Sequence, residues 1–445
     1  MDVLPSPAGP GGTRVLLIGN DELTDVTHRA LRDAGATVTN LRDPTDLAIR
    51  TALGRPVDTV VVISKDDHIS LRNALVVEGI RPGAPLVVTV FDRDVAVELE
   101  RAVRNVRVMS MADIVVPTLA GPCLGDRVLS VHRTANGLCA VRADDGGPRI
   151  GPLDLPPRSR RARLLEDIRA MLHPHELSAK ILMGGTIGFL LILAMDTIAT
   201  MHVLHESPVE AFYTATKTIV TVGPNQLVDE GPSWFKLVSA VMMIAALAFT
   251  ALFTAGVVNR LLDRRLTAIF GPRCLPRSGH VVVVGLGQVG LRLCLLLREL
   301  GAPVLAIESN ADADYVARAK DSRIPVVIGR GGSRFVLRRV LLQRARALAA
   351  VTSDEVENIA IVVAAHGECE ELRTLLRAGR GEVRNETRAL LKLGVVRDVY
   401  WIGGTLLAAA AMGSDACEAF EYEQTVYLVA PDGRIEPFRG DGAPA

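Results

Sequence analysis

Three closely spaced glycines follow a run of four valines in the second half of the chain. Val281–Gly290 reads VVVVGLGQVG, and Glu308 ends the next apolar run. Glycines at this spacing let a pyrophosphate approach the N-terminus of the following helix, and an acidic residue about 20 positions further on suits a ribose hydroxyl. The pattern therefore predicts a site for NAD(H) or another adenine nucleotide. The residues expected to form it are Gly285, Leu286, Gly287, Gln288, Val289, Gly290 and Glu308.

The glycine motif belongs to the second copy of an internal repeat. At an offset of 266 residues Gly285 falls on Gly19, and at an offset of 288 residues Asp354 falls on Asp66, so the second copy contains an insertion. In both copies short apolar runs, typical of strands buried on both faces, alternate with helical spacing. Alternation of this kind predicts βαβ units and a mostly parallel sheet. The expected fold class is therefore α/β, with two Rossmann-like domains.

The first copy lacks the features that would hold a nucleotide. Asp21, Thr24 and Arg42 replace the second glycine, the third glycine and the acidic residue. A carboxylate at position 21 would repel a pyrophosphate, and a threonine at position 24 would crowd the helix against the strand. We therefore predict that the first copy is structural and binds no nucleotide.

Two long apolar segments lie between the copies. Residues 178–204 and 234–258 each supply the roughly 20 apolar residues that a helix needs to cross a bilayer, although Asp196 interrupts the first. Arginines cluster before the first segment and after the second, whereas acidic residues and histidines dominate between them. Because Lys and Arg mark the cytoplasmic side, we expect both termini inside and the loop outside. The alternative is a buried helical hairpin of a soluble protein.

The segment between the two apolar runs resembles the pore loop of potassium channels. It reads AFYTATKTIVTVGPNQ (residues 211–226), a short threonine-rich helix leading into Thr-Val-Gly. The resemblance implies K⁺ as the permeant ion and an ion pathway lined by Thr221, Val222, Gly223, Pro224 and Asn225. Channel filters continue with Tyr-Gly, so the sequence departs from the family at Pro224, and Lys217 places a cation in the pore helix. Three interpretations stay open: a potassium channel with an altered outer filter, a less selective cation channel, and a non-conducting membrane sensor.

Rossmann-like domains joined to a two-span pore module resemble the RCK family, the regulators of potassium conductance. GLGQVG, Glu308 and VTSDEVEN (351–358) carry the resemblance in the second copy, and VTVFDRDVAVELE (88–100) carries it in the first. Family members have Gly-Asp-Ala where this chain has Arg330 within VVIGRGGS. An arginine there either favours a more phosphorylated nucleotide or marks a degenerate site, and Arg330 is added to the expected nucleotide site.

The RCK resemblance also implies an assembly and a function. Four chains would place eight Rossmann domains in a cytoplasmic ring, and nucleotide binding in that ring would gate the pore. The implied protein is a homotetrameric, nucleotide-gated potassium or cation channel. The same fold binds NAD for hydride transfer, so a membrane-anchored NAD-dependent oxidoreductase is the alternative. No catalytic constellation accompanies the glycine motif and His366 stands alone, so we expect no enzyme.

Composition and segment boundaries complete the expected organisation. A net charge of zero argues against a nucleic-acid partner, and six scattered cysteines offer no metal-ligand spacing. We expect a multi-pass protein of the plasma (inner) membrane, of bacterial origin. The expected segments are a disordered tail (1–13), the first RCK domain (14–120), a small β subdomain (121–150), a Pro/Arg linker with a juxtamembrane helix (151–177), the pore module (178–259, with its pore loop at 208–226), a linker (260–279), the second RCK domain (280–404) and a C-terminal helix with a β-hairpin (405–445).

Overall fold

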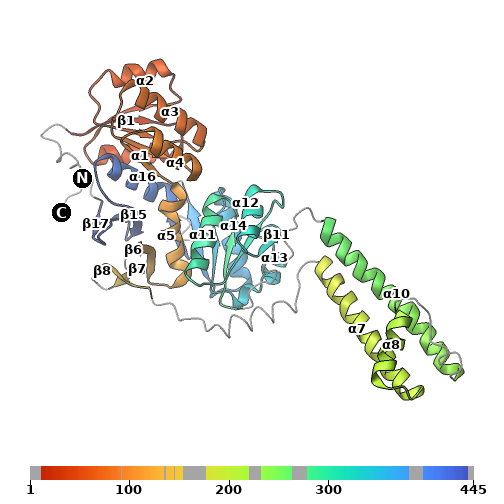
Figure 1. The fold of residues 1–445 in the computed structure, drawn as a ribbon. Coiled ribbons are helices and arrows are strands. Elements are labelled where there is room, and N and C mark those ends of the chain that lie inside the picture. Colours follow the sequence, from red (N-terminus) through yellow and green to blue (C-terminus); the bar gives the residue numbers. More distant parts are fainter. Residues whose placement is uncertain are drawn as a thin grey trace. The chain divides into compact units, whose positions relative to one another are not determined.

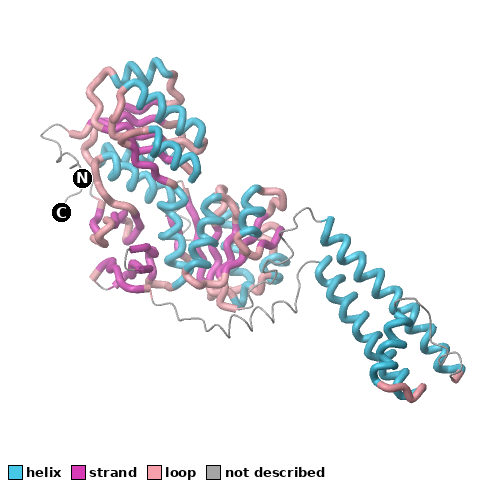
Figure 2. Tube along the Cα trace, viewed as in Figure 1, coloured by secondary structure: helices cyan, strands magenta, loops and turns pink. Residues whose placement is uncertain are grey.

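The computed structural model describes residues 12–91, 93–134, 137–144, 146–153, 177–219, 232–262, 278–379 and 394–438. The chain divides into two compact units (Figure 1 and Figure 2): a larger one of Met1–Arg158 with Pro276–Ala445, and a smaller one of Ser159–Leu275. Both copies of the repeat therefore belong to the larger unit, and the two apolar segments belong to the smaller one. The expected filter residues 221–225 and the expected juxtamembrane helix lie outside the described residues.

A five-stranded parallel sheet forms the centre of the first copy, with strand order β2-β1-β3-β4-β5. Three of its strands are continuous apolar runs buried along almost their whole length, as expected for parallel strands covered by helices on both faces. The strands are β1 (Arg14–Ile18), β2 (Thr37–Leu41), β3 (Thr59–Val62), β4 (Leu86–Thr89) and β5 (Val106–Met109). The helices that follow the first four strands are α1 (Glu22–Asp33), α2 (Asp46–Leu53), α3 (Asp67–Ile80) and α4 (Arg93–Ala102).

The second copy has a six-stranded parallel sheet with strand order β11-β10-β9-β12-β13-β14. Its strands are β9 (Val281–Val284), β10 (Val304–Glu308), β11 (Val326–Ile328), β12 (Ala347–Ala350), β13 (Arg373–Ala378) and β14 (Val395–Asp398). The described helices between them are α11 (Gln288–Glu299), α12 (Asp314–Asp321), α13 (Arg334–Arg339), the 3₁₀ turn η2 (Leu342–Arg344) and α14 (Glu355–Glu368). Strand β11 and helix α12 have no counterpart in the first copy, and they are the insertion that the change of offset predicted.

The last helix of each sheet packs on the other copy. Helix α5 (Met111–Leu124) follows β5 but packs against α11, β12 and β13, while α16 (Val399–Ala411) follows β14 but packs against α1, β3 and β4 (Figure 1). The contact with α1 is close, because a Cβ on Gly404 would lie 3.1 Å from the backbone nitrogen of Thr27. Buried side chains of both copies therefore form one continuous core. The segment boundaries expected at 120 and 404 fall inside these two exchanged helices.

Each copy ends in a small antiparallel sheet, and the two sheets share a core formed by Leu129, Val141, Phe420 and Val429. The first sheet contains β6 (Val128–Thr134), β7 (Gly137–Asp144) and β8 (Gly147–Pro152), and the second contains β15 (Glu418–Tyr422), β16 (Thr425–Val429) and β17 (Ile435–Pro437). The C-terminal hairpin expected from the sequence thus has a third strand, β15. Its turn was not recognisable because Glu423 and Gln424, with φ of 46° and 63°, take the positive φ usually supplied by Asn or Gly.

The described part of the smaller unit contains α7 (Leu177–Val203), α8 (Pro208–Ile219) and α10 (Ser233–Leu262), all in mutual contact. Glycines bring α7 close to α10: a Cβ on Gly185 would lie 2.9 Å from the backbone nitrogen of Phe253. Gly184–Val203 and Ser233–Ala255 are long and apolar enough to cross a membrane, and most of their side chains are exposed within the unit. A buried hairpin of a soluble protein would hide these side chains, so the pair fits a membrane protein better.

Candidate nucleotide-binding site

The glycine loop joins β9 to α11 at the carboxyl edge of the second sheet. Gly285 has a φ of +95°, and a Cβ there would lie 2.8 Å from the backbone nitrogen of Thr352. A Cβ on Gly290 would overlap the carbonyl oxygen of Gly285. Both positions therefore require glycine, the first for the turn and the second for the close approach of helix to strand.

Gly287 has a different role, because it leaves space at the N-terminus of α11. It is the N-cap residue, and within the described part of the chain no atom lies within 4 Å of a Cβ placed on it. Gly287 offers no side chain to cap α11, and the first turn of the helix contains no acidic residue. The free backbone N–H groups and the positive end of the helix dipole make this helix end suitable for a phosphate.

Glu308 ends β10, the strand next to β9, and its carboxylate is held at the glycine loop. One oxygen accepts a hydrogen bond of 2.8 Å from the backbone N–H of Leu286, and the other accepts one of 3.0 Å from the N–H of Asn310. Partial burial acts to raise the pKa of Glu308, but these backbone hydrogen bonds outweigh it and hold the pKa below its ordinary value. The carboxylate is therefore ionised at neutral pH, in the place where a ribose hydroxyl could donate to it.

The other expected site residues contribute in unequal ways. Leu286 and Val289 bury their side chains in the core, so only their backbone faces the loop. Gln288 is exposed at the start of α11. Arg330 is exposed in the loop after β11, at the same edge of the sheet, since the backbone N–H of Gly329 donates a 2.8 Å hydrogen bond to the carbonyl of Glu308. The structure thus brings the glycine loop, the carboxylate and the Arg330 loop to one edge.

The part of the chain that contains the glycine loop is similar to a known domain family. Residues 281–397 match the TrkA-N domain. Over 243 residues the chain is 24% identical to Potassium channel protein 1 of Methanocaldococcus jannaschii, an alignment that covers 53% of this chain and 71% of that protein. The solved GsuK channel is similar in fold, with a TM-score of 0.50 at 14% identity over 92% of this chain and 64% of that chain. The GsuK channel bound to NAD matches over the same shares at 12% identity, with a TM-score of 0.47.

The TrkA-N domain contains two further residues at this edge that the sequence analysis did not single out. Gly285 faces Thr352, which follows β12, so the loop after β12 forms the opposite wall of the crevice between β9 and β12. Asn358 is almost completely buried and joins this loop to the next strand: it accepts from the N–H of Thr352 (2.9 Å) and donates to the carbonyl of Arg377 (3.0 Å). Both residues lie in the VTSDEVEN motif, and only the paired strands reveal that it adjoins the glycine loop.

In the first copy, side chains occupy the positions that correspond to the glycine loop and Glu308 of the second copy. Asp21 caps α1 and forms a capping box with Thr24, whose backbone N–H donates a 2.8 Å hydrogen bond to the Asp21 carboxylate. Arg42, at the position of Glu308, is paired with Asp25 at 2.6 Å. A carboxylate thus takes the place at the helix N-terminus that a phosphate would need. This arrangement agrees with the prediction that the first copy is structural.

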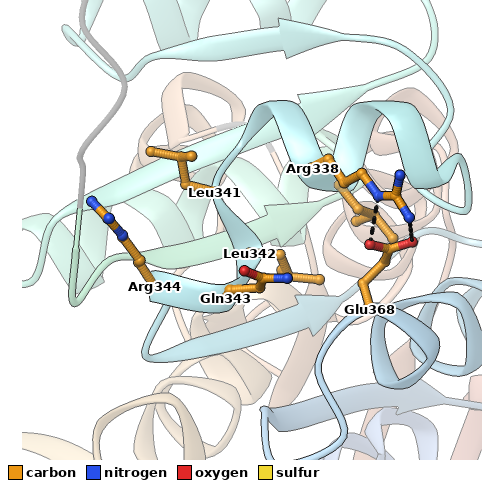
Figure 3. A pocket seen from close by; sticks show the side chains of 7 residues that line it. Arg338, Leu341, Leu342, Gln343, Arg344 and Glu368 are labelled. Atoms are coloured by element: carbon orange, nitrogen blue, oxygen red, sulfur yellow. Dashed lines mark hydrogen bonds and ion pairs between the residues drawn. The ribbon is translucent and has the colours of Figure 1, made fainter.

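Two surface cavities of the TrkA-N domain lie at the opposite edge of its sheet. The larger, of about 670 Å³, is lined by Leu337, Arg338, Leu341, Leu342, Gln343, Arg344 and Glu368. Figure 3 shows that the guanidinium of Arg338 makes two hydrogen bonds to Glu368, of 2.8 and 3.2 Å. Arg338 is thus already paired with a carboxylate, while Arg344 also lines the cavity. The glycine loop, beside a helix N-terminus that no side chain of Gly287 caps, remains the better candidate for a phosphate.

Proposed function

We propose that each chain binds one NAD(H), or another adenine nucleotide, at the glycine loop of its TrkA-N domain and none in its first copy. The observation that carries the proposal is a difference between the two copies. The N-terminus of α11 at Gly287 has no side-chain cap, whereas the N-terminus of α1 is capped by the carboxylate of Asp21. Glu308 would accept a hydrogen bond from the ribose, and Arg330 would lie beside a further phosphate. The nucleotide acts here as a regulatory ligand rather than a hydride carrier.

We further propose that the chain is a subunit of a nucleotide-gated potassium or cation channel, assembled as a homotetramer with two RCK domains per chain. The similarity to a potassium channel protein and the two apolar helices flanking α8 support this proposal. Two spans cannot enclose a pore, so several chains must do so. The weakly selective channel and the non-conducting sensor remain the competing proposals, because the filter departs from the family at Pro224.

Flux through the purified full-length protein in liposomes tests the channel proposal. We expect potassium flux to exceed sodium flux and to change at least tenfold when NAD(H) is added, because a ligand shifts an equilibrium by its differential affinity for the two states. Absence of flux together with tight nucleotide binding would instead favour the membrane sensor. Hydride transfer from NADH to a substrate would favour the oxidoreductase.

Labelling in intact cells tests the orientation, with both termini in the cytoplasm. Cysteines introduced at Glu206 or Asp229 are expected to react with a membrane-impermeant maleimide, and cysteines at Arg158 or Arg265 are not, because arginine-rich flanks stay inside. Permeabilised cells provide the control, since all four positions should then react. The reverse pattern would place the TrkA-N domain outside the cell and remove its access to cellular nucleotide.

A further inference from the structure

The larger of the two surface cavities of the TrkA-N domain has an apolar floor. It measures about 670 Å³, and Leu337 and Leu342 in its lining are almost completely buried. Leu341 adds a side chain that is 39% exposed. A cavity of this volume lies in the range of small-molecule sites, which are mostly apolar with a few polar groups that orient the ligand. We propose that the cavity binds an amphipathic carboxylate of the fatty-acid class.

The turn that forms one wall of this cavity has a strained backbone. Leu341 lies between α13 and η2 with φ of 53° and ψ of 49°, in the left-handed region that a bulky residue rarely adopts. The offset of 288 residues aligns it with Leu53 of the first copy, which is only 8% exposed. The second copy therefore turns a leucine outwards, at the expense of backbone strain. Strain of this kind is concentrated at ligand sites and switch regions.

The charges of the lining select a ligand with one negative charge. Figure 3 shows Arg344 on one side of the cavity and the Arg338–Glu368 pair on the other, with Leu341 and Leu342 between them. Glu368 neutralises Arg338, whereas among the described residues no ion pair or hydrogen bond reaches the guanidinium of Arg344. A planar carboxylate can accept two parallel hydrogen bonds from a guanidinium. A phosphate dianion would in addition be repelled by Glu368.

The cavity adjoins the place where the chain enters the TrkA-N domain. The carbonyl of Arg344 accepts a hydrogen bond of 2.7 Å from the N–H of Gly279, and the N–H of Arg346 donates one of 2.7 Å to the carbonyl of His280. Gly279 and His280 immediately precede β9, at the end of the segment that follows α10 in the sequence. In the first copy Pro56 stands at the position of Arg344, so the cation belongs to the second copy alone. A ligand against η2 would therefore lie beside the first residues of the TrkA-N domain.

Photolabelling of the full-length protein in lipid nanodiscs tests the proposal. The probe is decanoate that carries a diazirine on its chain, and the labelled peptides are identified by mass spectrometry. We expect adducts in the peptide that contains Leu341 and Leu342, and unlabelled decanoate should remove them. Decyltrimethylammonium has the same chain and the opposite charge, so it should not compete, and decyl phosphate should compete about tenfold more weakly than decanoate. Adducts in α10 report the probe dissolved in the bilayer and serve as the internal reference.

Substitutions in the lining locate the ligand. Arg344→Gln should reduce the cavity adducts about tenfold relative to those in α10, because it removes a charged hydrogen-bond donor, and Arg344→Lys should retain most of them. Arg339→Gln, at an exposed arginine of α13 outside the lining, is the matched control. Leu341→Asn should also reduce labelling but leave the melting temperature nearly unchanged, because asparagine tolerates the left-handed region.

Two results would overturn the proposal. Absence of adducts in the Leu341 peptide would show that the cavity is not a ligand site. Adducts that Arg344→Gln leaves unchanged, or that decyltrimethylammonium removes as well as decanoate does, would show that no carboxylate is recognised there. No nucleotide is added in these experiments, so their outcome is independent of the proposal for the glycine loop.

Discussion

Gly287→Asp is expected to lower the affinity of the protein for NAD(H) about 1,000-fold while leaving the fold intact. The substitution installs the residue of the first copy, Asp21, at the N-terminus of α11. Two like charges 4 Å apart repel by about 4 kcal/mol at the effective dielectric of a partly exposed site, and each 1.4 kcal/mol is a factor of ten. Stability should be unchanged or slightly higher, because aspartate is a favourable N-cap and a Cβ meets no atom there within the described residues.

Calorimetric titration of the full-length protein measures both the affinity and the number of sites. We expect one site per chain in the unmodified protein and none in Gly287→Asp. The matched control is Gly287→Ala, which adds the Cβ without the charge and should weaken binding less than tenfold. Two sites per chain, or unchanged affinity in the aspartate variant, would contradict the assignment of the nucleotide to the second copy.

Gly290→Ala is expected to destabilise the TrkA-N domain by about 3 kcal/mol, the upper end of the usual range for overpacking. The added Cβ would overlap the carbonyl oxygen of Gly285, a backbone atom that cannot rotate away. Helix α11 must then move off the strand, and nucleotide affinity should fall with it. For the larger unit, whose unfolding entropy at roughly 2 cal/mol/K per residue is about 0.7 kcal/mol/K, such a change lowers Tm by roughly 4 °C.

Thermal unfolding of the full-length protein measures this effect, and Gly287→Ala again provides the control, since it lies in the same loop without a steric conflict. A second comparison comes from the first copy, where Asp21→Ala removes the side chain that caps α1 and should cost about 1 kcal/mol. If Gly290→Ala melts within 1 °C of the unmodified protein, the close approach of α11 to the glycine loop is not required.

The local pattern of residues was sufficient to predict the two α/β copies and the glycine loop. Val281–Val284 is a run of β-branched residues with no polar interruption, which is typical of a strand buried on both faces. Of the glycines after it, Gly285 takes a positive φ that other residues rarely adopt. The insertion in the second copy was also predictable, because it changes the repeat offset. These features depend on neighbours in the chain, so they could be inferred before any tertiary contact was known.

The exchanged helices could not be predicted in the same way. Helix α16 directly follows β14 of the second copy. Its sequence gives no indication that it packs against α1 rather than against its own sheet. That choice depends on which surfaces are complementary across several hundred residues, as in the close contact of Gly404 with Thr27. The expected boundaries at 120 and 404 therefore cut through helices that belong by packing to the other copy.

The features of the candidate site also fall into two groups: some were predictable from neighbouring residues, and others are set by tertiary contacts. Glycine spacing and an acidic residue at the end of β10 are local features, and the sequence alone determined that Glu308 would stand near the loop. Only the tertiary structure decided that Thr352 forms the opposite wall and that Asn358 joins β12 to β13, because strand order is set by pairing between distant segments.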